Sequence, residues 1–159
     1  MSEPQRAVEA VGWRELVTLP DIYEKKVSAK IDTGARTSCL HADITETFDR
    51  DGMTWVRFEL GLHDESIDPI VCELPVEDQR RITSSNGETE ERFIVKTGLI
   101  LGDQRFDAEF SLTNRSDMKF PILIGRTALK KRFLVDSGRS YLQSPREERQ
   151  RLLGRGKNT

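Results

Sequence analysis

The segment Ala29–Ala35 reads Ala-Lys-Ile-Asp-Thr-Gly-Ala and places a carboxylate, a hydroxyl group and a glycine next to one another. Alternating apolar residues come before it and predict a strand that ends at Asp32. Such a strand fixes the position of the carboxylate, Gly34 lets a backbone amide approach it, and Thr33 can hydrogen-bond within the loop. This arrangement suits a carboxylate that is partly dehydrated and aimed at a substrate. The same three residues also describe an ordinary turn, so alone they leave both interpretations open.

A second unit, Phe120–Arg126, reads Phe-Pro-Ile-Leu-Ile-Gly-Arg and leads into Thr127–Lys131, which has helical character. The apolar run predicts a buried strand, and the glycine after it, Gly125, permits tight packing. Arg126 then stands beside one predicted turn of helix. The two units together, with predicted β-hairpins between them, are more specific than either is alone.

These units resemble the retropepsin-like aspartic peptidases, in which an Asp-Thr/Ser-Gly-Ala loop lies upstream of a strand ending in Ile-Ile/Leu-Gly-Arg and a short helix. More narrowly, Asp32–Ser38 with His41, and the segment 114–118 (Asn-Arg-Ser-Asp-Met), resemble a bacterial subfamily. That subfamily is associated with ATP-grasp ligases that add glutamates to a ribosomal protein, and it has carried the label "ATP-dependent zinc protease". The resemblance covers about residues 11–142.

The resemblance implies a mechanism in which two carboxylates share one proton. One polarises the scissile carbonyl while the other takes a proton from water, and at hydrogen-bond distance the two cannot both be ionised. One Asp-Thr-Gly loop per chain therefore implies a homodimer in which each chain supplies Asp32. Carried onto this sequence, the resemblance makes Asp32, Thr33 and Gly34 the catalytic loop, Ala35 a substrate-facing backbone position, and Gly125 and Arg126 structural residues.

A second tripeptide of the same type, Asp-Ser-Gly at Asp136–Gly138, would suggest a two-lobed enzyme with both carboxylates in one chain. Two lobes, each with its own barrel, would need roughly twice this length. The tripeptide also joins the short runs Phe133–Val135 and Ser140–Leu142, which favours a turn. We therefore expect Asp136 to be a structural partner for an arginine.

The sequence departs from the retroviral pattern at two places. Retroviral members carry an acidic or amide residue after Asp-Thr-Gly-Ala, whereas Arg36 occupies that position here and makes the neighbouring subsite basic. Their glycine-rich flap, which closes over the substrate and excludes water, has its nearest counterpart in the hairpin Arg80–Arg92. Ser84 and Ser85 lie at the tip of this hairpin and are predicted to contact substrate.

Arginines near these segments suggest an acidic substrate. Arg36, Arg81, Arg92 and Arg115 could converge on one cleft and bind carboxylates in a bidentate manner. An acidic peptide, such as one with a glutamate tail, would fit such a cleft, and Arg36 and Arg92 are the predicted contacts. The alternative is that these arginines pair with the chain's own 27 acidic residues on solvated strand faces.

Alternating patterns predict the elements that must hold these residues. Apolar residues recur at every second position along Val56–Leu62 and Phe106–Leu112, as in strands with one face in a core. Gly102-Asp103 and Asn86-Gly87 predict hairpin turns. We expect a mainly β, retropepsin-like closed barrel with one short helix. Its organisation would be a flexible segment 1–10, a peptidase domain 11–142, and a basic helical or flexible tail 143–159.

Composition excludes several classes of protein. The chain has 159 residues, enough for one domain, and its 25 basic and 27 acidic residues give a net charge of −2, so neither a nucleic acid nor a membrane is an expected partner. The N-terminus lacks the pattern of a secretory signal, and the two cysteines do not make a disulfide framework. We therefore expect a cytoplasmic protein.

The spacing of histidine and cysteine residues along the sequence tests whether the chain could bind zinc, as the label of the subfamily suggests. The chain has neither a His-Glu-x-x-His helix nor a Cys-x-x-Cys pair, the spacings that place ligands on one side of a metal. We predict no metal and no cofactor, and expect His41 to be a hydrogen-bonding residue. If the chain did bind zinc, the candidate ligands would be Asp32, Cys39, His41, His63 and Cys72.

The sequence thus predicts an aspartic endopeptidase that acts as a homodimer on a peptide or protein substrate. The subfamily resemblance adds an ATP-grasp glutamate ligase, or its ribosomal protein target, as a partner. Two alternatives remain open. One is a binding module of the same fold, without turnover, for an acidic peptide or a ligase. The other is a zinc-dependent peptidase.

Overall fold

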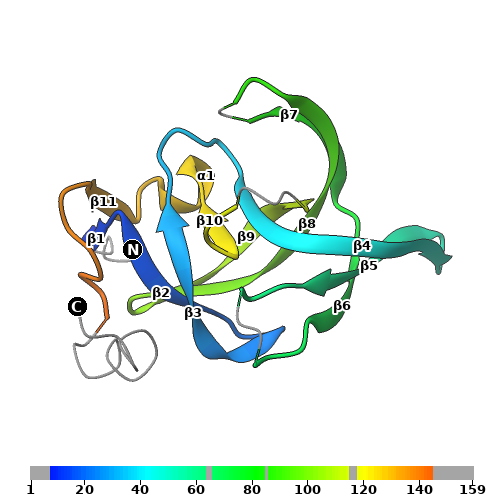
Figure 1. Ribbon diagram of the computed structural model, residues 1–159, viewed down its shortest axis with the longest axis horizontal. Coiled ribbons are helices and arrows are strands. Elements are labelled where there is room, and N and C mark those ends of the chain that lie inside the picture. Colours follow the sequence, from blue (N-terminus) through cyan, green and yellow to red (C-terminus); the bar gives the residue numbers. More distant parts are fainter. Residues whose placement is uncertain (1–7, 64–65, 85, 115–117, 145–159) are drawn as a thin grey trace, which may run out of the picture.

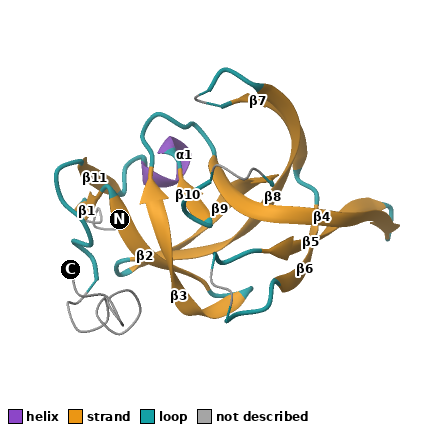
Figure 2. Ribbon diagram, viewed as in Figure 1, coloured by secondary structure: helices purple, strands orange, loops and turns teal. Residues whose placement is uncertain are grey.

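Strands make up most of the chain in the computed structural model, which describes residues 8–63, 66–84, 86–114 and 118–144 (Figure 1). Eleven strands and one short helix lie within these residues (Figure 2). In chain order they are β1 (Glu9–Gly12), β2 (Arg14–Leu19), β3 (Tyr23–Ile31), β4 (Ser38–Arg50), β5 (Met53–Leu60), β6 (Ile70–Pro75), β7 (Asp78–Thr83), β8 (Thr89–Leu101), β9 (Gln104–Thr113), β10 (Ile122–Ile124), α1 (Arg126–Leu129) and β11 (Phe133–Asp136).

Six of the strands close into a barrel. Each pairs with the next in the order β3, β2, β8, β9, β4, β10, and β10 pairs again with β3. The pairs β3–β10 and β4–β9 are parallel, and the other four are antiparallel. β5 and β6 extend the sheet from the far half of β4, and β7 pairs with β8 outside the ring. The expected fold, a mainly β closed barrel with one short helix, is confirmed.

Alternation along the strands produces the core. In β5, Val56, Phe58 and Leu60 are fully buried, whereas Arg57 and Glu59 between them remain partly exposed. Because successive side chains of a strand point to opposite faces, this segment turns its apolar face into the barrel. Burial of each such side chain contributes about 1.5–3 kcal/mol. The core that results is rigid enough to hold a loop in place at its rim.

Two hairpin turns lie where their glycines predict them. Gly102 has a φ of +61° in the loop that joins β8 to β9, and Gly87 has a φ of +88° at the tip of the β7–β8 hairpin. Positive φ costs glycine little because it has no Cβ atom. These turns fix the register of three consecutive strands, β7, β8 and β9.

Most of the predicted flexible segment 1–10 and of the predicted tail 143–159 lies outside the described residues. Of what is described, β1 begins at Glu9 and pairs in parallel with β11, and Ser144 is buried. The predicted C-terminal helix falls in 145–159, outside the described residues.

The short helix begins one residue earlier and ends two residues earlier than predicted. It was expected over 127–131, but α1 spans Arg126–Leu129. The backbone leaves the helical conformation at Lys130, whose ψ is 129°, and at Lys131, whose φ is +68°. Within the described ranges, no helix is long and apolar enough to cross a membrane.

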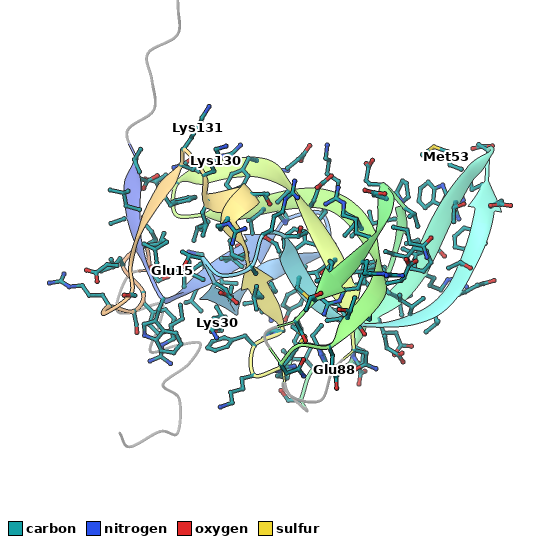
Figure 3. The ribbon with its side chains drawn as sticks, turned by 90° about the horizontal axis from the view of Figure 1, so that it is seen from above. Glu15, Lys30, Met53, Glu88, Lys130 and Lys131 are labelled. Atoms are coloured by element: carbon teal, nitrogen blue, oxygen red, sulfur yellow. The ribbon has the colours of Figure 1, made fainter. Side chains whose placement is uncertain are left out.

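Glu15 is a fully buried carboxylate that the sequence did not single out (Figure 3). Its Oε2 accepts hydrogen bonds from the backbone N–H groups of Gly12, at 2.8 Å, and Leu142, at 2.7 Å. Its Oε1 accepts one from the N–H of Gln143, at 3.1 Å. A buried carboxylate that is satisfied in this way fastens the segment after β11 onto β1 and β2.

Replacing Glu15 with alanine is therefore expected to destabilise the protein. The substitution leaves three backbone N–H groups without their acceptor. Each buried N–H group left unpaired destabilises the fold by about 1–3 kcal/mol, and water that enters the space left by the side chain offsets part of this loss. We expect the free energy of unfolding to fall by about 3 kcal/mol in urea titrations. Glu24→Ala, at an exposed position of β3, is the matched control and should change it by less than about 0.5 kcal/mol. Equal stability of the two variants would contradict the assigned role of Glu15.

Candidate active site

Asp32 follows directly on the last residue of β3 and is held in a tight loop. Its N–H donates to the carbonyl of Ile124 at 2.8 Å, which continues the parallel pairing of β3 with β10. Its Oδ1 accepts a hydrogen bond from the N–H of Gly34 at 2.9 Å, and its carbonyl accepts one from the N–H of Ala35 at 3.2 Å. The carboxylate is therefore oriented by backbone groups while remaining partly exposed to solvent.

The start of α1 binds the far side of this loop. The N–H of Arg126 donates to the carbonyl of Ala35 at 2.8 Å, and the N–H of Thr127 donates to the carbonyl of Arg36 at 3.0 Å. The first amides of a helix have no partner within the helix, so the loop supplies the acceptors that they need. Two chain segments far apart in the sequence thereby position each other.

Gly125 allows this close approach. A Cβ atom at this residue would lie 2.8 Å from the carbonyl carbon of Thr37 and 2.9 Å from the carbonyl oxygen of Ala35, both backbone atoms. The N–H of Gly125 donates to Ser38 Oγ at 2.9 Å. The glycine was predicted to permit tight packing, and the segment that packs on it is the loop that carries the carboxylate.

The Arg126 side chain adds a third connection. Its Nη1 donates to the carbonyl of Thr33 at 3.0 Å and to that of Gly34 at 3.2 Å. An acidic residue at position 36 would be an alternative partner, but Arg36 stands there. The guanidinium therefore binds the backbone of the Asp32 loop.

Asp32 lies at the edge of a cleft of about 730 Å³. The β7–β8 hairpin forms the opposite wall: β7 curves toward the side of the barrel where α1 and the loop after β3 lie (Figure 1). Ser84 lines this cleft, and its Oγ lies close to the carbonyl of Glu88 within its own turn. Ser85 lies outside the described residues. The lining residues are Asp32, Gly34, Ala35, Arg36, Thr37, Cys39, Arg80, Arg81, Ile82, Thr83, Ser84, Arg92, Met118, Leu123 and Arg126.

The cleft is strongly basic. Its described lining carries five arginines against one carboxylate, that of Asp32. Arg36 and Arg81 are exposed, and neither makes an ion pair within the described residues. Unpaired guanidinium groups on facing walls raise the local concentration of anions and are available to bind carboxylates. Arg115, a further candidate, lies outside the described residues.

Two of the cleft arginines are instead neutralised by the chain itself. Arg80 pairs with Asp78 at 2.7 Å and with Glu109 at 3.0 Å. Arg92, only 7% exposed, pairs with Glu90 at 2.6 Å. Of the arginines named in the prediction, Arg92 therefore pairs with an internal acid, while Arg36 and Arg81 line the cleft without an acidic partner among the described residues. Arg80, which the prediction did not name, is also paired.

Asp136, in the second Asp-x-Gly tripeptide, is the last residue of β11, just before a turn, and is not among the residues that line this cleft. Its Oδ1 accepts a hydrogen bond from the N–H of Gly138 at 3.0 Å, and its carbonyl accepts one from the N–H of Arg139 at 3.1 Å. Its Oδ2 lies 3.7 Å from Nε of Arg139. The local hydrogen bonding therefore copies that of Asp32, although Asp136 does not border the cleft at Asp32.

The candidate metal ligands do not gather. His41 and His63 meet edge to face, with ring centroids 4.7 Å apart, but no group of three or more histidine, cysteine or acidic side chains that could hold a metal occurs among the described residues. Burial, followed by the nearby His63, lowers the pKa of His41. The buried Nδ1 of His41 has no hydrogen-bond partner among the described residues. Burial raises the pKa of the Cys72 thiol to about 11, so it stays protonated at neutral pH.

Several cleft residues were missed at the level of sequence. Leu123 was assigned to a buried strand, but alternation within the three-residue strand β10 turns it to the cleft while Ile122 and Ile124 face the core. Ile82 and Met118 give the cleft further apolar surface. Alternation along β10 was a sequence signal that could have placed Leu123 in the cleft. No such signal existed for Met118, because its position depends on a contact between distant segments.

Comparisons with known proteins identify the family of the chain. Residues 10–146 match the RimB-like family, described as "Retropepsin-like aspartic endopeptidase RimB". A probable alpha-L-glutamate ligase of Desulfotalea psychrophila is 38% identical over 133 residues, and one of Shewanella pealeana is 39% identical over 132 residues. Each match covers 82% of this chain but only 28% and 29% of the ligases, so the chain spans less than a third of these relatives.

A crystal structure from Legionella pneumophila gives the same fold. That protein, of unknown function, is 27% identical, superposes with a TM-score of 0.73, and is matched over 87% of this chain and 100% of its own length. The family match extends from β1 to the residues after β11 and includes both the Asp32 loop and the Gly125–Arg126 unit. The chain therefore belongs to the RimB-like family of retropepsin-like aspartic endopeptidases.

Proposed function

We propose that the chain is an aspartic endopeptidase that acts as a homodimer, with Asp32 from each chain activating the attacking water. The observation that carries this proposal is the arrangement at Asp32. Its carboxylate is oriented by a backbone amide, its loop is fastened to α1, and it borders a cleft with a hairpin as the opposite wall. Family membership supports the same reaction class.

The chemistry needs two carboxylates in different states. The ionised one takes a proton from water, whose oxygen attacks the scissile carbonyl carbon, while the protonated one donates its proton toward the carbonyl oxygen. Collapse of the tetrahedral intermediate breaks the C–N bond, and the amine leaves with a proton. Gly34 keeps one oxygen of Asp32 in place by donating its N–H.

One chain supplies half of this site. Among the described residues that line the cleft, Asp32 is the one acidic residue, so the second carboxylate has to come from elsewhere. A two-fold axis that passes between two copies would bring one Asp32 to the other, and the cleft would continue across the interface. The homodimer is therefore part of the proposal.

The charge of the cleft points to an acidic peptide. Arg36, from the loop beside the catalytic carboxylate, and Arg81, from the hairpin opposite, have no acidic partner within the described residues. The relatives named probable alpha-L-glutamate ligase contain this domain within a longer chain, which links it to glutamate addition. We therefore assign a glutamate-tailed protein as the substrate and a glutamate ligase, or its ribosomal protein target, as the partner in the cytoplasm.

Cleavage of matched peptides tests this assignment. A glutamate-tailed peptide should be cleaved by the wild-type protein, and Arg36→Ala and Arg81→Ala should each raise its KM about tenfold, since a hydrogen bond to a charged group contributes about 1.5–3 kcal/mol. Arg105→Ala, an exposed arginine outside the cleft, is the control and should leave KM unchanged. Products are measured by mass spectrometry.

A glutamine-tailed peptide has side chains of the same length as glutamate but without their charge, so it separates the effect of charge from that of side-chain length. We expect it to be a poor substrate, and we expect the KM of the glutamate-tailed peptide to rise with salt, because exposed charges are screened. Equal cleavage of both peptides, with Arg36→Ala fully active, would remove the acidic-substrate assignment while leaving the peptidase proposal in place.

The binding module without turnover stays a second candidate because the same arginines would hold an acidic peptide without cleaving it. In that case the wild type and Asp32→Asn would bind the glutamate-tailed peptide equally, and neither would form products across a range of pH. A zinc-dependent peptidase would instead lose its activity on treatment with a chelator.

A further inference from the structure

Arg92 is a buried arginine whose contacts the peptidase chemistry does not use. It lies on β8, in the strand that returns from the flap-like hairpin, and is 7% exposed. Its Nε pairs with Glu90 at 2.6 Å. Its Nη1 donates to Ser111 Oγ at 3.3 Å and lies 3.7 Å from the sulfur of Cys39. The guanidinium therefore links three strands, β8, β9 and β4.

The contacts continue from Ser111 toward the candidate active site. Ser111 Oγ donates to the carbonyl of Ser38 at 3.3 Å. Ser38 Oγ, in turn, accepts the N–H of Gly125 at 2.9 Å. Gly125 stands immediately before Arg126, whose side chain and N–H hold the Asp32 loop. Hydrogen bonds, joined through the covalent structure of Ser38 and of Gly125–Arg126, thus connect the base of the hairpin with the loop.

These groups form a polar seam that runs from the exposed side chain of Glu90 through the buried Arg92, Ser111 and Ser38. We use this name for the side chains of Ser38, Glu90, Arg92 and Ser111 together with the N–H of Gly125. Ser38 and Ser111 are essentially fully buried. Burying a guanidinium and two hydroxyl groups costs free energy unless every group is paired, and apolar residues of similar size would fill the space without that cost. A paired network, however, fixes one relative arrangement of the elements that it joins.

We propose that the polar seam is a positioning device that sets the base of the β7–β8 hairpin relative to the Asp32 loop. Arg92 is then a positioning residue, acting through Ser111 and Ser38, and not a substrate contact as the sequence suggested. This role rests on the proposed peptidase function, because the hairpin must close over the loop at a fixed distance for water to be excluded from the reaction.

Hydrogen exchange tests the connection without relying on activity. Ser111→Ala interrupts the seam while keeping the ion pair of Arg92 with Glu90. We expect it to speed exchange of the Gly125 amide, and of amides in the peptide 32–38, by about tenfold or more. Thr97→Val, which removes another buried hydroxyl from β8, is the matched control and should leave this exchange unchanged. Equal exchange in the two variants, with both folded, would overturn the proposal.

Kinetics on the glutamate-tailed peptide give the second measurement. Ser111→Ala should lower kcat about tenfold with KM nearly unchanged, since the substrate contacts persist while the hairpin and loop are misaligned. Arg92→Lys should behave alike, because a lysine reaches Glu90 but cannot also bridge to Ser111. Thr97→Val should retain wild-type kcat.

The two proposals can fail separately. If the wild type cleaves no peptide but Ser111→Ala still speeds exchange in 32–38, the peptidase assignment fails and the mechanical link stands. If the wild type cleaves and both seam variants retain wild-type kcat and wild-type exchange, the positioning role fails and the peptidase assignment stands.

Discussion

Asp32→Asn is expected to lower kcat for peptide cleavage by about a thousandfold or more, with the barrel still folded. General acid–base catalysis by a positioned side chain contributes about 10²–10⁴-fold, and in a homodimer this substitution removes both carboxylates at once. An amide can neither take a proton from water nor share one with a neighbour. Its oxygen can still accept the Gly34 N–H, so the loop keeps its shape. Product formation and thermal unfolding are the two measurements.

Asp136→Asn is the matched control because it makes the same chemical change in a loop of the same geometry. Asp136 accepts the N–H of Gly138 at 3.0 Å, as Asp32 accepts that of Gly34 at 2.9 Å, yet it lies outside the cleft. We expect this variant to retain wild-type kcat. Full activity of Asp32→Asn, or loss of activity in both variants, would refute the assignment of Asp32.

Mixing the two proteins tests whether the site is shared between chains. If each site needs Asp32 from both chains, a fourfold excess of Asp32→Asn protein should leave about one fifth of the wild-type activity after subunit exchange. Size-exclusion chromatography with light scattering would confirm that mixed dimers form. Activity that does not change with added variant would show that one chain is sufficient.

Gly125→Ala is expected to lower kcat/KM about a hundredfold, the second largest effect. The added Cβ would meet backbone atoms of Thr37 and Ala35 at 2.8–2.9 Å, and backbone atoms cannot swing aside as a flexible side chain can. The loop that carries Asp32 therefore has to shift, and displacing a catalytic group by about 1 Å costs about 10²-fold in rate. We also expect the free energy of unfolding to fall by about 1–3 kcal/mol.

Gly138→Ala provides the control for this substitution. Its nearest neighbour to a new Cβ would be Asp136 Oδ1 at 3.5 Å, an ordinary contact, so activity and stability should both remain close to wild type. Cleavage kinetics and urea unfolding decide the comparison. If Gly125→Ala keeps full activity, the close packing of α1 against the loop does not position the carboxylate.

The barrel and the two motif segments could be predicted from the sequence because their signals are local. Alternation in β5 and β9 marks their buried faces, and Gly102 marks the turn after β8. The Asp32 loop and the Gly125–Arg126 unit are short runs of distinctive residue types, so each could be recognised by itself, although the contacts that join them lie between distant segments. Signals contained within a few residues are therefore readable from one sequence.

Contacts between distant segments could not be predicted. Arg80 and Arg81 are neighbours in the sequence, yet Arg80 is neutralised by Glu109 from β9 and by Asp78, while Arg81 has no such partner within the described residues. That difference depends on the face of the sheet to which each side chain points, because Glu109 of β9 is within reach of Arg80. The role of Glu15 likewise depends on the segment after β11 returning to β2, which no local pattern indicates.

The parallel pairing of β1 with β11 has a consequence for how this domain is used in longer proteins. The first and last strands of the described residues therefore lie side by side, away from the wall of the cleft that β7 forms (Figure 1). Ends that lie close together favour the use of a domain within a larger protein, as in the ligase relatives, where the matched region makes up less than a third of the chain.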